Sequence, residues 1–155
     1  MSKANFAASR KVNPPGATPL SAAQVWEGLY IKAREPALFI PILNSSEVVE
    51  DKGDYVVRKV GFGPNPPITE NIKLYDGTIA YFHSPETGHE VTNVLSYNED
   101  NELVLTYSFA GGIPGQKPTD ELPSPDELNK SVGRTVEQHL VIIRELVANG
   151  RIKAK

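Results

Sequence analysis

The sequence predicts an α+β fold in which a single curved antiparallel sheet of seven strands surrounds a long C-terminal helix. Three observations lead to this prediction. Signals for the start and the end of a helix bracket Ser124 to Asn149. Between Glu47 and Ala110, apolar and polar residues alternate with the period of two that is typical of strands. Short turns join these segments, and short turns connect antiparallel neighbours.

The C-terminal helix has clear sequence signals at both ends. Ser124 is a good N-cap, Pro125 suits the first helical position, and Glu127 completes a capping box. Asn149-Gly150 provides the stop. At about 1.5 Å per residue, the helix is roughly 37 Å long. Because a helix of this length crosses a small domain, the other elements must pack around it.

One face of this helix is apolar but carries two polar residues. Thr135 and His139 fall inside the apolar stripe. Two interpretations are open: His139 is either a core histidine satisfied by one partner, or part of a cavity wall that contains a few polar groups. At the helical period, the apolar members of the stripe are Leu128, Val132, Val136, Ile143 and Leu146.

The first part of the chain predicts one strand followed by two short helices. Asn5 to Val12 forms the strand, which ends at Asn13-Pro14-Pro15-Gly16 because proline cannot continue a ladder. Ser21 caps the first helix, with Gln24 as its capping-box partner. Pro36 breaks this helix, and Pro36 to Leu43 gives a second short helix. Two short helices that meet at a break can support one end of a sheet.

Six further strands follow, joined by hairpin-like turns of which Asp76-Gly77 is the strongest signal. Only the long helix is large enough to cover one face of the sheet, and a curved sheet leaves space beneath it. We expect the loop from Phe62 to Pro67 to border the mouth of this space and to move more than the flanking strands. The predicted strands are Glu47 to Glu50, Tyr55 to Val60, Ile68 to Tyr75, Thr78 to His83, His89 to Tyr97 and Glu102 to Ala110.

Arg58 is the one charged strand residue that departs from the usual solvent-exposed position. By alternation it shares a face with Val56 and Val60, whereas Tyr55 and Val57 occupy the other face. If the Arg58 face points inward, the guanidinium is buried and needs an acidic partner or an anionic ligand. The opposite orientation is also open.

The composition indicates a single domain, 1–155, that is soluble and cytoplasmic. The chain has 155 residues and no cysteine, which excludes a disulfide scaffold, a cysteine-ligated metal and a thiol nucleophile. A net charge of -3 argues against a general binder of nucleic acid or membrane surfaces. The first residues lack the apolar core of a signal peptide, and no segment is long and apolar enough to span a bilayer.

The sequence contains no motif for a metal or a cofactor. His83, His89 and His139 are the only histidines, and their spacing matches no metal motif. The glycines of Gly61-Phe62-Gly63 and Gly111-Gly112 do not lie between a strand and a helix N-terminus, where loops that bind dinucleotides or phosphates place theirs. We therefore expect neither a metal nor a cofactor.

Three stretches of the sequence have counterparts in known proteins. They are Val12-Asn13-Pro14-Pro15, Gln24 to Arg34, and Val91 to Ser96 together with Glu102 to Tyr107. These stretches resemble a small family of uncharacterised microbial and fungal proteins within the START/Bet v 1-like superfamily, also called SRPBCC or helix-grip. The order of elements resembles that superfamily over nearly the whole chain. The resemblance implies a helix-grip fold with a hydrophobic cavity, in a superfamily that includes lipid and hormone binders, polyketide cyclases and other cofactor-free enzymes.

These features predict a protein that binds a polyketide-, terpenoid- or alkaloid-like molecule in an internal cavity and promotes its cyclisation, isomerisation or dehydration without a cofactor. His139 is the first candidate for the general acid or base, because histidine titrates near neutral pH. Tyr107 and Asn93 can orient or hydrogen-bond a carbonyl. The candidate ligand contacts are Trp26, Tyr30, Arg58, Tyr81, Phe109, Thr135, Val136 and Ile143.

Two other functions are compatible with the same features. The cavity can store or carry a hydrophobic ligand without chemistry, or it can be vestigial in a protein-interaction module. An enzyme requires a positioned pair of titratable groups in the cavity, whereas a carrier requires few. The expected partner is a hydrophobic ligand or substrate, with a homodimer left open; neither nucleic acid nor a membrane is expected.

Overall fold

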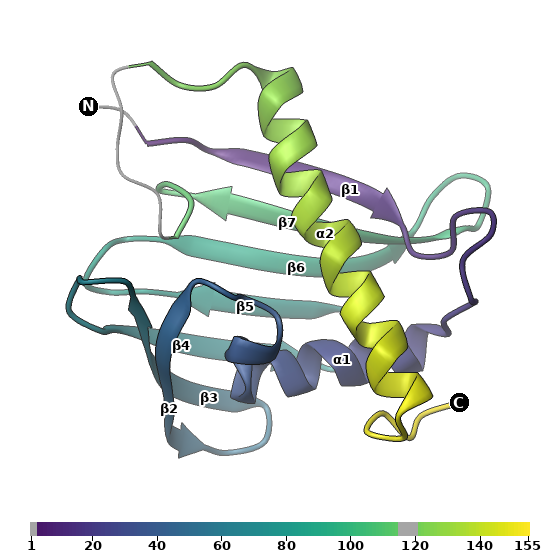
Figure 1. Ribbon diagram of the computed structural model, residues 1–155, viewed down its shortest axis with the longest axis horizontal. Coiled ribbons are helices and arrows are strands. Elements are labelled where there is room, and N and C mark those ends of the chain that lie inside the picture. Colours follow the sequence, from purple (N-terminus) through teal and green to yellow (C-terminus); the bar gives the residue numbers. More distant parts are fainter. Residues whose placement is uncertain (1–2, 115–120) are drawn as a thin grey trace.

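The computed structural model describes residues 3–114 and 121–155. Its elements follow the predicted order of one strand, two helical segments, six strands and a long helix (Figure 1). The elements are β1 (Phe6–Lys11), α1 (Ala22–Arg34), η1 (Pro36–Leu38), β2 (Leu43–Asp51), β3 (Tyr55–Phe62), β4 (Ile68–Tyr75), β5 (Ile79–His83), β6 (Glu90–Tyr97), β7 (Leu103–Ala110) and α2 (Pro125–Ala148).

The strands form one seven-stranded antiparallel sheet in the order β1-β7-β6-β5-β4-β3-β2. From β2 to β7, each strand pairs with the next along the chain, as the hairpin-like turns predict. β1 pairs instead with β7, which places Ala8 opposite Tyr107. The first strand therefore forms the far edge of the sheet, and the predicted helix-grip fold is confirmed.

The helical segment after β1 differs in part from the prediction. α1 begins with the predicted capping box, in which Ser21 and Gln24 each accept a hydrogen bond from the other's backbone amide. The second short helix is only the three-residue 3-10 turn η1. It is short because Leu43 already pairs with Phe62, so that β2 begins well before the predicted Glu47.

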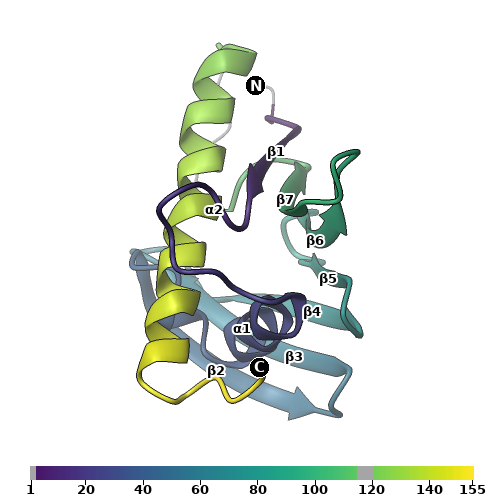
Figure 2. The ribbon, with the colours of Figure 1, turned by 90° about the vertical axis from the view of Figure 1, so that its right-hand side faces the viewer.

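α2 crosses the inner face of the sheet (Figure 2). The apolar residues of its predicted stripe are buried. Its C-terminal half packs tightly: Ile143 is fully buried, and a Cβ at Gly28 of α1 would lie 2.6 Å from its Cγ1. Gly28 therefore allows the two helices to approach closely. The space between helix and sheet lies under the other half of α2, which contributes Ser131, Val132, Thr135 and His139 to its wall. Neither helix in the described part of the chain combines the length and apolar character needed to cross a bilayer.

Candidate functional site

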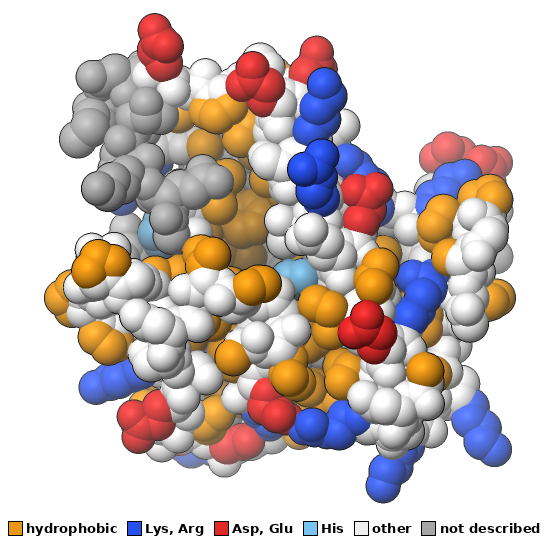
Figure 3. Space-filling view, viewed as in Figure 1, with side chains coloured by type: hydrophobic (Ala, Val, Ile, Leu, Met, Phe, Trp, Pro, Cys, Tyr) orange, Lys and Arg blue, Asp and Glu red, His pale blue; other side chains and the backbone are white. Residues whose placement is uncertain are grey.

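A cavity of about 290 Å³ lies between the N-terminal half of α2 and the inner face of the sheet. Figure 3 shows a hollow beside α2 with hydrophobic side chains in its depth. The strands supply its floor, while the segment after η1, the start of β2 and the segment after β7 border it. Its lining residues are Lys32, Ile40, Ile42, Leu43, Arg58, Phe62, Glu70, Phe82, Val91, Tyr107, Phe109, Ile113, Pro114, Ser131, Val132, Thr135 and His139.

The cavity wall is mostly apolar, but buried polar side chains interrupt it. Lys32, Arg58, Glu70, Tyr107 and His139 all line the cavity and are all buried. They come from α1, β3, β4, β7 and α2, so only the folded chain brings them together. This combination of an apolar wall and a few convergent polar groups is typical of small-molecule sites.

Lys32 carries its amine into the interior on the last turn of α1. Its Nζ donates a hydrogen bond to Oδ1 of Asn93 at 2.8 Å. It also lies 4.2 Å from the centre of the Tyr107 ring and 5.5 Å from that of Phe82. Burial, and then the charge of Arg58, lower the pKa of Lys32 well below its usual 10.5, whereas Glu70 acts in the opposite direction. The environment thus favours the neutral amine more than any exposed site would.

Asn93 supports Lys32 from β6. Its side chain is fully buried and lies on the strand that pairs with β7, directly opposite Tyr107. Its Oδ1 accepts from Lys32, but its Nδ2 has no hydrogen-bond partner among the described residues. Asn93 is not one of the residues that line the cavity. It therefore holds the amine from behind rather than facing the cavity itself.

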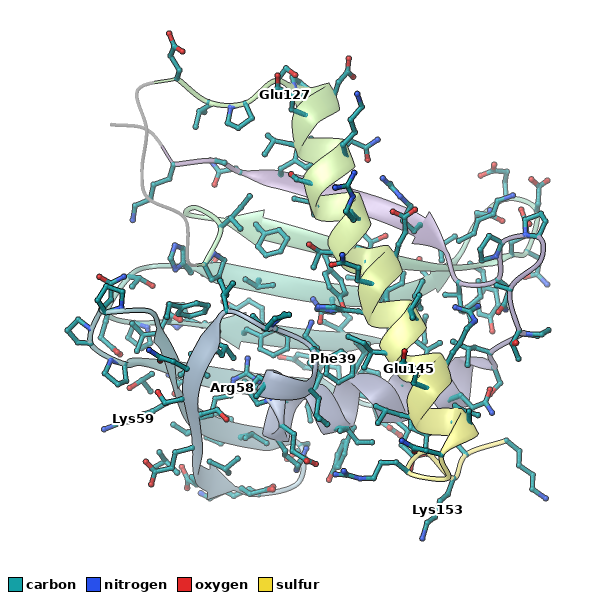
Figure 4. The ribbon with its side chains drawn as sticks, in the orientation of Figure 1. Phe39, Arg58, Lys59, Glu127, Glu145 and Lys153 are labelled. Carbon is teal, nitrogen blue, oxygen red and sulfur yellow. The ribbon has the colours of Figure 1, made fainter. Side chains whose placement is uncertain are left out.

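Arg58 points inward, which settles the two orientations left open by the sequence. Its guanidinium bonds Oε1 of Glu70 through Nε at 2.9 Å and through Nη2 at 2.8 Å. Its Nη1 donates to the backbone carbonyls of Lys32 and Ala33 at 2.8 and 3.1 Å. Figure 4 shows Arg58 close to η1, behind β2. The acidic partner that burial requires is therefore Glu70, on the neighbouring strand β4.

Tyr107 and His139 form a hydrogen-bonded pair in the cavity wall, which joins β7 to α2. The Tyr107 hydroxyl lies 2.7 Å from Nδ1 of His139. The imidazole also has a hydrogen bond with the backbone of Phe39 and packs edge-on against the Phe39 ring, with ring centres 5.3 Å apart. In Figure 4, Phe39 lies between η1 and α2. His139 thus has two partners, one on the sheet and one in the segment after η1.

Burial keeps both members of this pair neutral. Desolvation, followed by the charge of Lys32, lowers the pKa of His139 from 6.5 to about 2, although its bond with Phe39 acts in the opposite direction. Desolvation raises the pKa of the Tyr107 hydroxyl well above 10.0. His139 therefore does not titrate near neutral pH, contrary to the expectation from the sequence. It is a neutral imidazole whose Nδ1 can accept a hydrogen bond from the neutral phenol.

The structure brings five of the sequence-predicted site residues to the cavity wall. These are His139, Tyr107, Arg58, Phe109 and Thr135. The predicted catalytic candidate Asn93 lies behind Lys32, as described above. Phe62, the first residue of the predicted loop from Phe62 to Pro67 and the last of β3, lines the cavity, whereas residues 63–67 are not among the lining residues.

Five other predicted ligand contacts are not among the lining residues. Val136 and Ile143 are fully buried in the core beneath α2, because the stripe of α2 is wider than the cavity. Trp26 packs against both clusters of core residues. Tyr30 is 38% exposed on the outer side of α1, where Arg34 stacks on its ring. Tyr81 bonds Glu90, an exposed residue of β6.

Lys32 and Glu70 line the cavity but are not among the site residues predicted from the sequence. Lys32 sits between Ile31 and Ala33, both buried, so a charged residue inside a buried stretch of helix was the available signal. Glu70 shares its strand face with Ile72 and Leu74. In each case, alternation or helical period placed a charge on an apolar face.

No group of three metal-ligating side chains converges within residues 3–114 and 121–155. The one carboxylate in the cavity wall, Glu70, is bonded to Arg58. The chemistry available in the described cavity is therefore that of an amine, a phenol, an imidazole and an ion pair.

Comparison with known proteins assigns the chain to a family. Residues 6–150 match the family described as AtaL, acetylaranotin biosynthesis cluster protein L. The chain belongs to this family. No match was found among curated proteins. The AtaL match agrees with the START/Bet v 1-like architecture that the sequence resembles.

Solved structures share the fold of this AtaL family member at low sequence identity. Ara h 8.0201 is 17% identical with a TM-score of 0.54, covering 94% of this chain and 98% of its own. The Bacillus halodurans protein BH1534 is 16% identical with a TM-score of 0.56, covering 90% and 96%. The di-domain ARO/CYC StfQ, from the steffimycin biosynthetic pathway, is 12% identical with a TM-score of 0.63, covering 95% of this chain and 51% of its own. The AtaL chain thus spans about half of that di-domain protein.

Replacement of Arg58 is expected to be much more destabilising than replacement of a neighbouring exposed cation. Arg58→Met leaves a buried carboxylate without its partner, which costs about 3–5 kcal/mol. Adding Glu70→Gln should recover part of this loss, because it removes the unpaired charge. Lys59→Met, on the same strand but exposed, is the matched control and should change stability by less than about 1 kcal/mol. Urea unfolding measures all four chains, and equal losses for Arg58→Met and Lys59→Met would contradict the assigned role of the ion pair.

Stability should fall with acid partly because of His139. Between pH 6.5 and about 2, the unfolded chain binds a proton on His139 that the folded chain excludes, so the free energy of unfolding decreases as pH falls. The slope that His139 contributes is at most about 1.4 kcal/mol per pH unit. His139→Gln should therefore lose less stability than the wild type between about pH 6 and 4. Identical slopes in urea unfolding would mean that His139 titrates equally in the folded and unfolded chains.

Proposed function

We propose that this AtaL family member binds a hydrophobic small molecule in the cavity under α2 and promotes its cyclisation, isomerisation or dehydration without a cofactor. The observation that carries the proposal is the hydrogen-bonded pair of Tyr107 and His139 in the cavity wall. A protein that only stores a ligand has no need of two buried, mutually bonded proton-transfer groups at the ligand's surface. An enzyme requires such a pair.

The size and the lining of the cavity support a hydrophobic ligand. Its volume of about 290 Å³ is close to the lower end of small-molecule sites, about 300 Å³. Phe82, Phe109 and Val132 contribute apolar surface on both the sheet and the helix side. A ligand with an apolar body and one or two oxygen atoms fits this distribution, because its oxygen atoms can meet the polar groups while its body covers the apolar wall.

The comparisons support a role in biosynthesis. The family description places its namesake in a biosynthesis cluster. Two of the similar folds are ARO/CYC, or aromatase/cyclase, proteins from the steffimycin and BE-7585A biosynthetic pathways. Cyclisation of a polyketide-like chain is therefore the reaction we put first.

In this proposal Tyr107 and His139 act together on an oxygen or an acidic hydrogen of the ligand. The phenol has one hydroxyl hydrogen, which can turn from Nδ1 of His139 to polarise a ligand carbonyl, and the imidazole, which burial keeps neutral, can then accept a hydrogen bond from the ligand. Thr135 and Phe109 border the same space and would contact the ligand's body. Asn93 contributes indirectly, by positioning Lys32.

The binding part of the proposal is tested with a cavity-filling variant. Thr135→Phe places a ring in the cavity, whereas Gln138→Phe places the same ring on the exposed side of α2. Anilinonaphthalene sulfonate should bind to the wild type and to Gln138→Phe with similar affinity. Thr135→Phe should weaken binding by roughly tenfold or more, which corresponds to about 1.4 kcal/mol. Equal affinity for all three chains would show that the dye does not use this cavity.

The catalytic part is tested with a linear poly-β-ketone thioester and analysis of the cyclised products. The wild type should change the rate or the distribution of products relative to the spontaneous reaction. Tyr107→Phe and His139→Gln should slow the catalysed reaction by about 10²–10⁴-fold while dye affinity is retained. If the wild type has no effect on any product but binds the compound, the chain is a carrier. If both variants turn over like the wild type, the pair is a structural feature of the wall.

A further inference from the structure

The amine of Lys32 differs from every ordinary lysine in its surroundings. The side chain is 5% exposed, lines the cavity and has a hydrogen bond to a neutral amide oxygen. Within the described part of the chain, no carboxylate oxygen bonds Nζ, and Glu70, the carboxylate of the cavity wall, is bonded to Arg58. An ammonium group has three N–H donors to satisfy, and this site offers one acceptor atom and two aromatic faces.

The groups around Lys32 favour an uncharged amine. Arg58 of β3 is a fixed positive charge, and Glu70 of β4 largely neutralises it. Tyr107 of β7 and His139 of α2 are neutral at ordinary pH. The ring faces favour a cation, but desolvation is the largest influence on the pKa of Lys32 and lowers it. A lysine in an apolar pocket beside another cation is one of the known ways to make an amine nucleophilic.

We propose that Lys32 Nζ is a nucleophile that condenses with a ketone or aldehyde carbonyl of the molecule bound in the cavity. This inference rests on the proposed function, because it assumes that a small molecule enters the cavity. It names the reactive group of that molecule: a carbonyl with acidic hydrogens on the adjacent carbon, as in a β-dicarbonyl compound.

The amine and the carbonyl supply every atom that the condensation requires. The lone pair of Nζ attacks the carbonyl carbon, an N–C bond forms, and the oxygen takes a proton from Nζ to give a carbinolamine. The C–O bond then breaks, and the oxygen leaves as water with the second hydrogen from Nζ, giving an imine. Transfer of a proton from the adjacent carbon to the nitrogen, with a shift of the double bond from C=N to C=C, converts the imine into an enamine, which is a carbon nucleophile suited to ring closure. Hydrolysis reverses the sequence and restores the amine.

The position of Lys32 suits this chemistry. Its Nζ lies over the Tyr107 ring, while the hydroxyl of that tyrosine bonds His139. A carbonyl carbon bound at Nζ therefore sits in the same wall as a phenol and an imidazole, which can exchange protons with the departing oxygen or the adjacent carbon. The hydrogen bond from Nζ to Oδ1 of Asn93 holds the amine in this position.

The test uses acetylacetone, a small β-dicarbonyl that forms a stable, ultraviolet-absorbing enaminone with free amines. At pH 7 an exposed lysine is free amine in only about one molecule in 10³. The wild type should gain the mass of one acetylacetone less one water, and peptide mapping should locate it at Lys32. Labelling of Lys32 should be roughly tenfold or more faster than labelling of the exposed Lys59, which points away from the molecule (Figure 4).

Two variants control the labelling. Lys32→Met should lose the fast reaction, and Lys59→Met should keep it. Mapping on the wild type decides the question even if Lys32→Met does not fold. Labelling of Lys32 no faster than Lys59 in the folded wild type would overturn the proposal.

Dye binding in the same samples separates this proposal from the proposed function. If anilinonaphthalene sulfonate binds in the cavity and Lys32 is inert, the cavity assignment stands and the nucleophile is wrong. If Lys32 is labelled rapidly but the dye does not bind, the amine is confirmed and the hydrophobic site is contradicted.

Discussion

The contacts of Arg58 are the constraint on which the interior of this protein depends. One guanidinium joins β3 to β4 through Glu70 and joins the sheet to α1 through the carbonyls of Lys32 and Ala33. The last carbonyls of a helix have no partners within the helix, so Arg58 satisfies groups that burial would otherwise leave unpaired. The end of α1 is thereby fixed over the sheet, and the side chain of Lys32 has to enter the interior.

The position of Lys32 contributes to the chemical properties of the cavity wall. The side chains that fill the space under the C-terminal half of α2 are apolar, with Ile143 packed against Gly28. Under the other half, the wall contains an amine, a phenol and an imidazole that water reaches poorly. Because burial penalises the charged form, each of these groups prefers its neutral form. The interior thus combines an apolar lining with groups that can exchange protons or react as nucleophiles, which a plain core would exclude.

The sequence predicted the fold more completely than the site, for physical reasons. Helix caps at Ser21 and Ser124, strand alternation and short turns are local, and they reproduced the element order and the antiparallel sheet. His139, Tyr107 and Arg58 reached the cavity because each carries a polar group on an apolar face. Val136 and Tyr81 do not line the cavity. Helical period and strand alternation show which residues share a face, but they do not show how far the cavity extends or which face of a strand points inward. The pKa of His139 and the meeting of Lys32 with Asn93 depend on contacts between distant elements, which no local pattern specifies.

The most direct test of this account is the protonation of Lys32 in the folded protein. Nuclear magnetic resonance of chains carrying ¹³C-labelled lysine follows the side-chain carbon next to each amine as pH is raised from about 6 to 11. The account predicts one lysine signal, absent from Lys32→Met, whose midpoint lies well below the common value of about 10.4. If the signal assigned to Lys32 titrates together with those of the exposed lysines, its amine is an ordinary ammonium at neutral pH, and the reactive interior described above is contradicted.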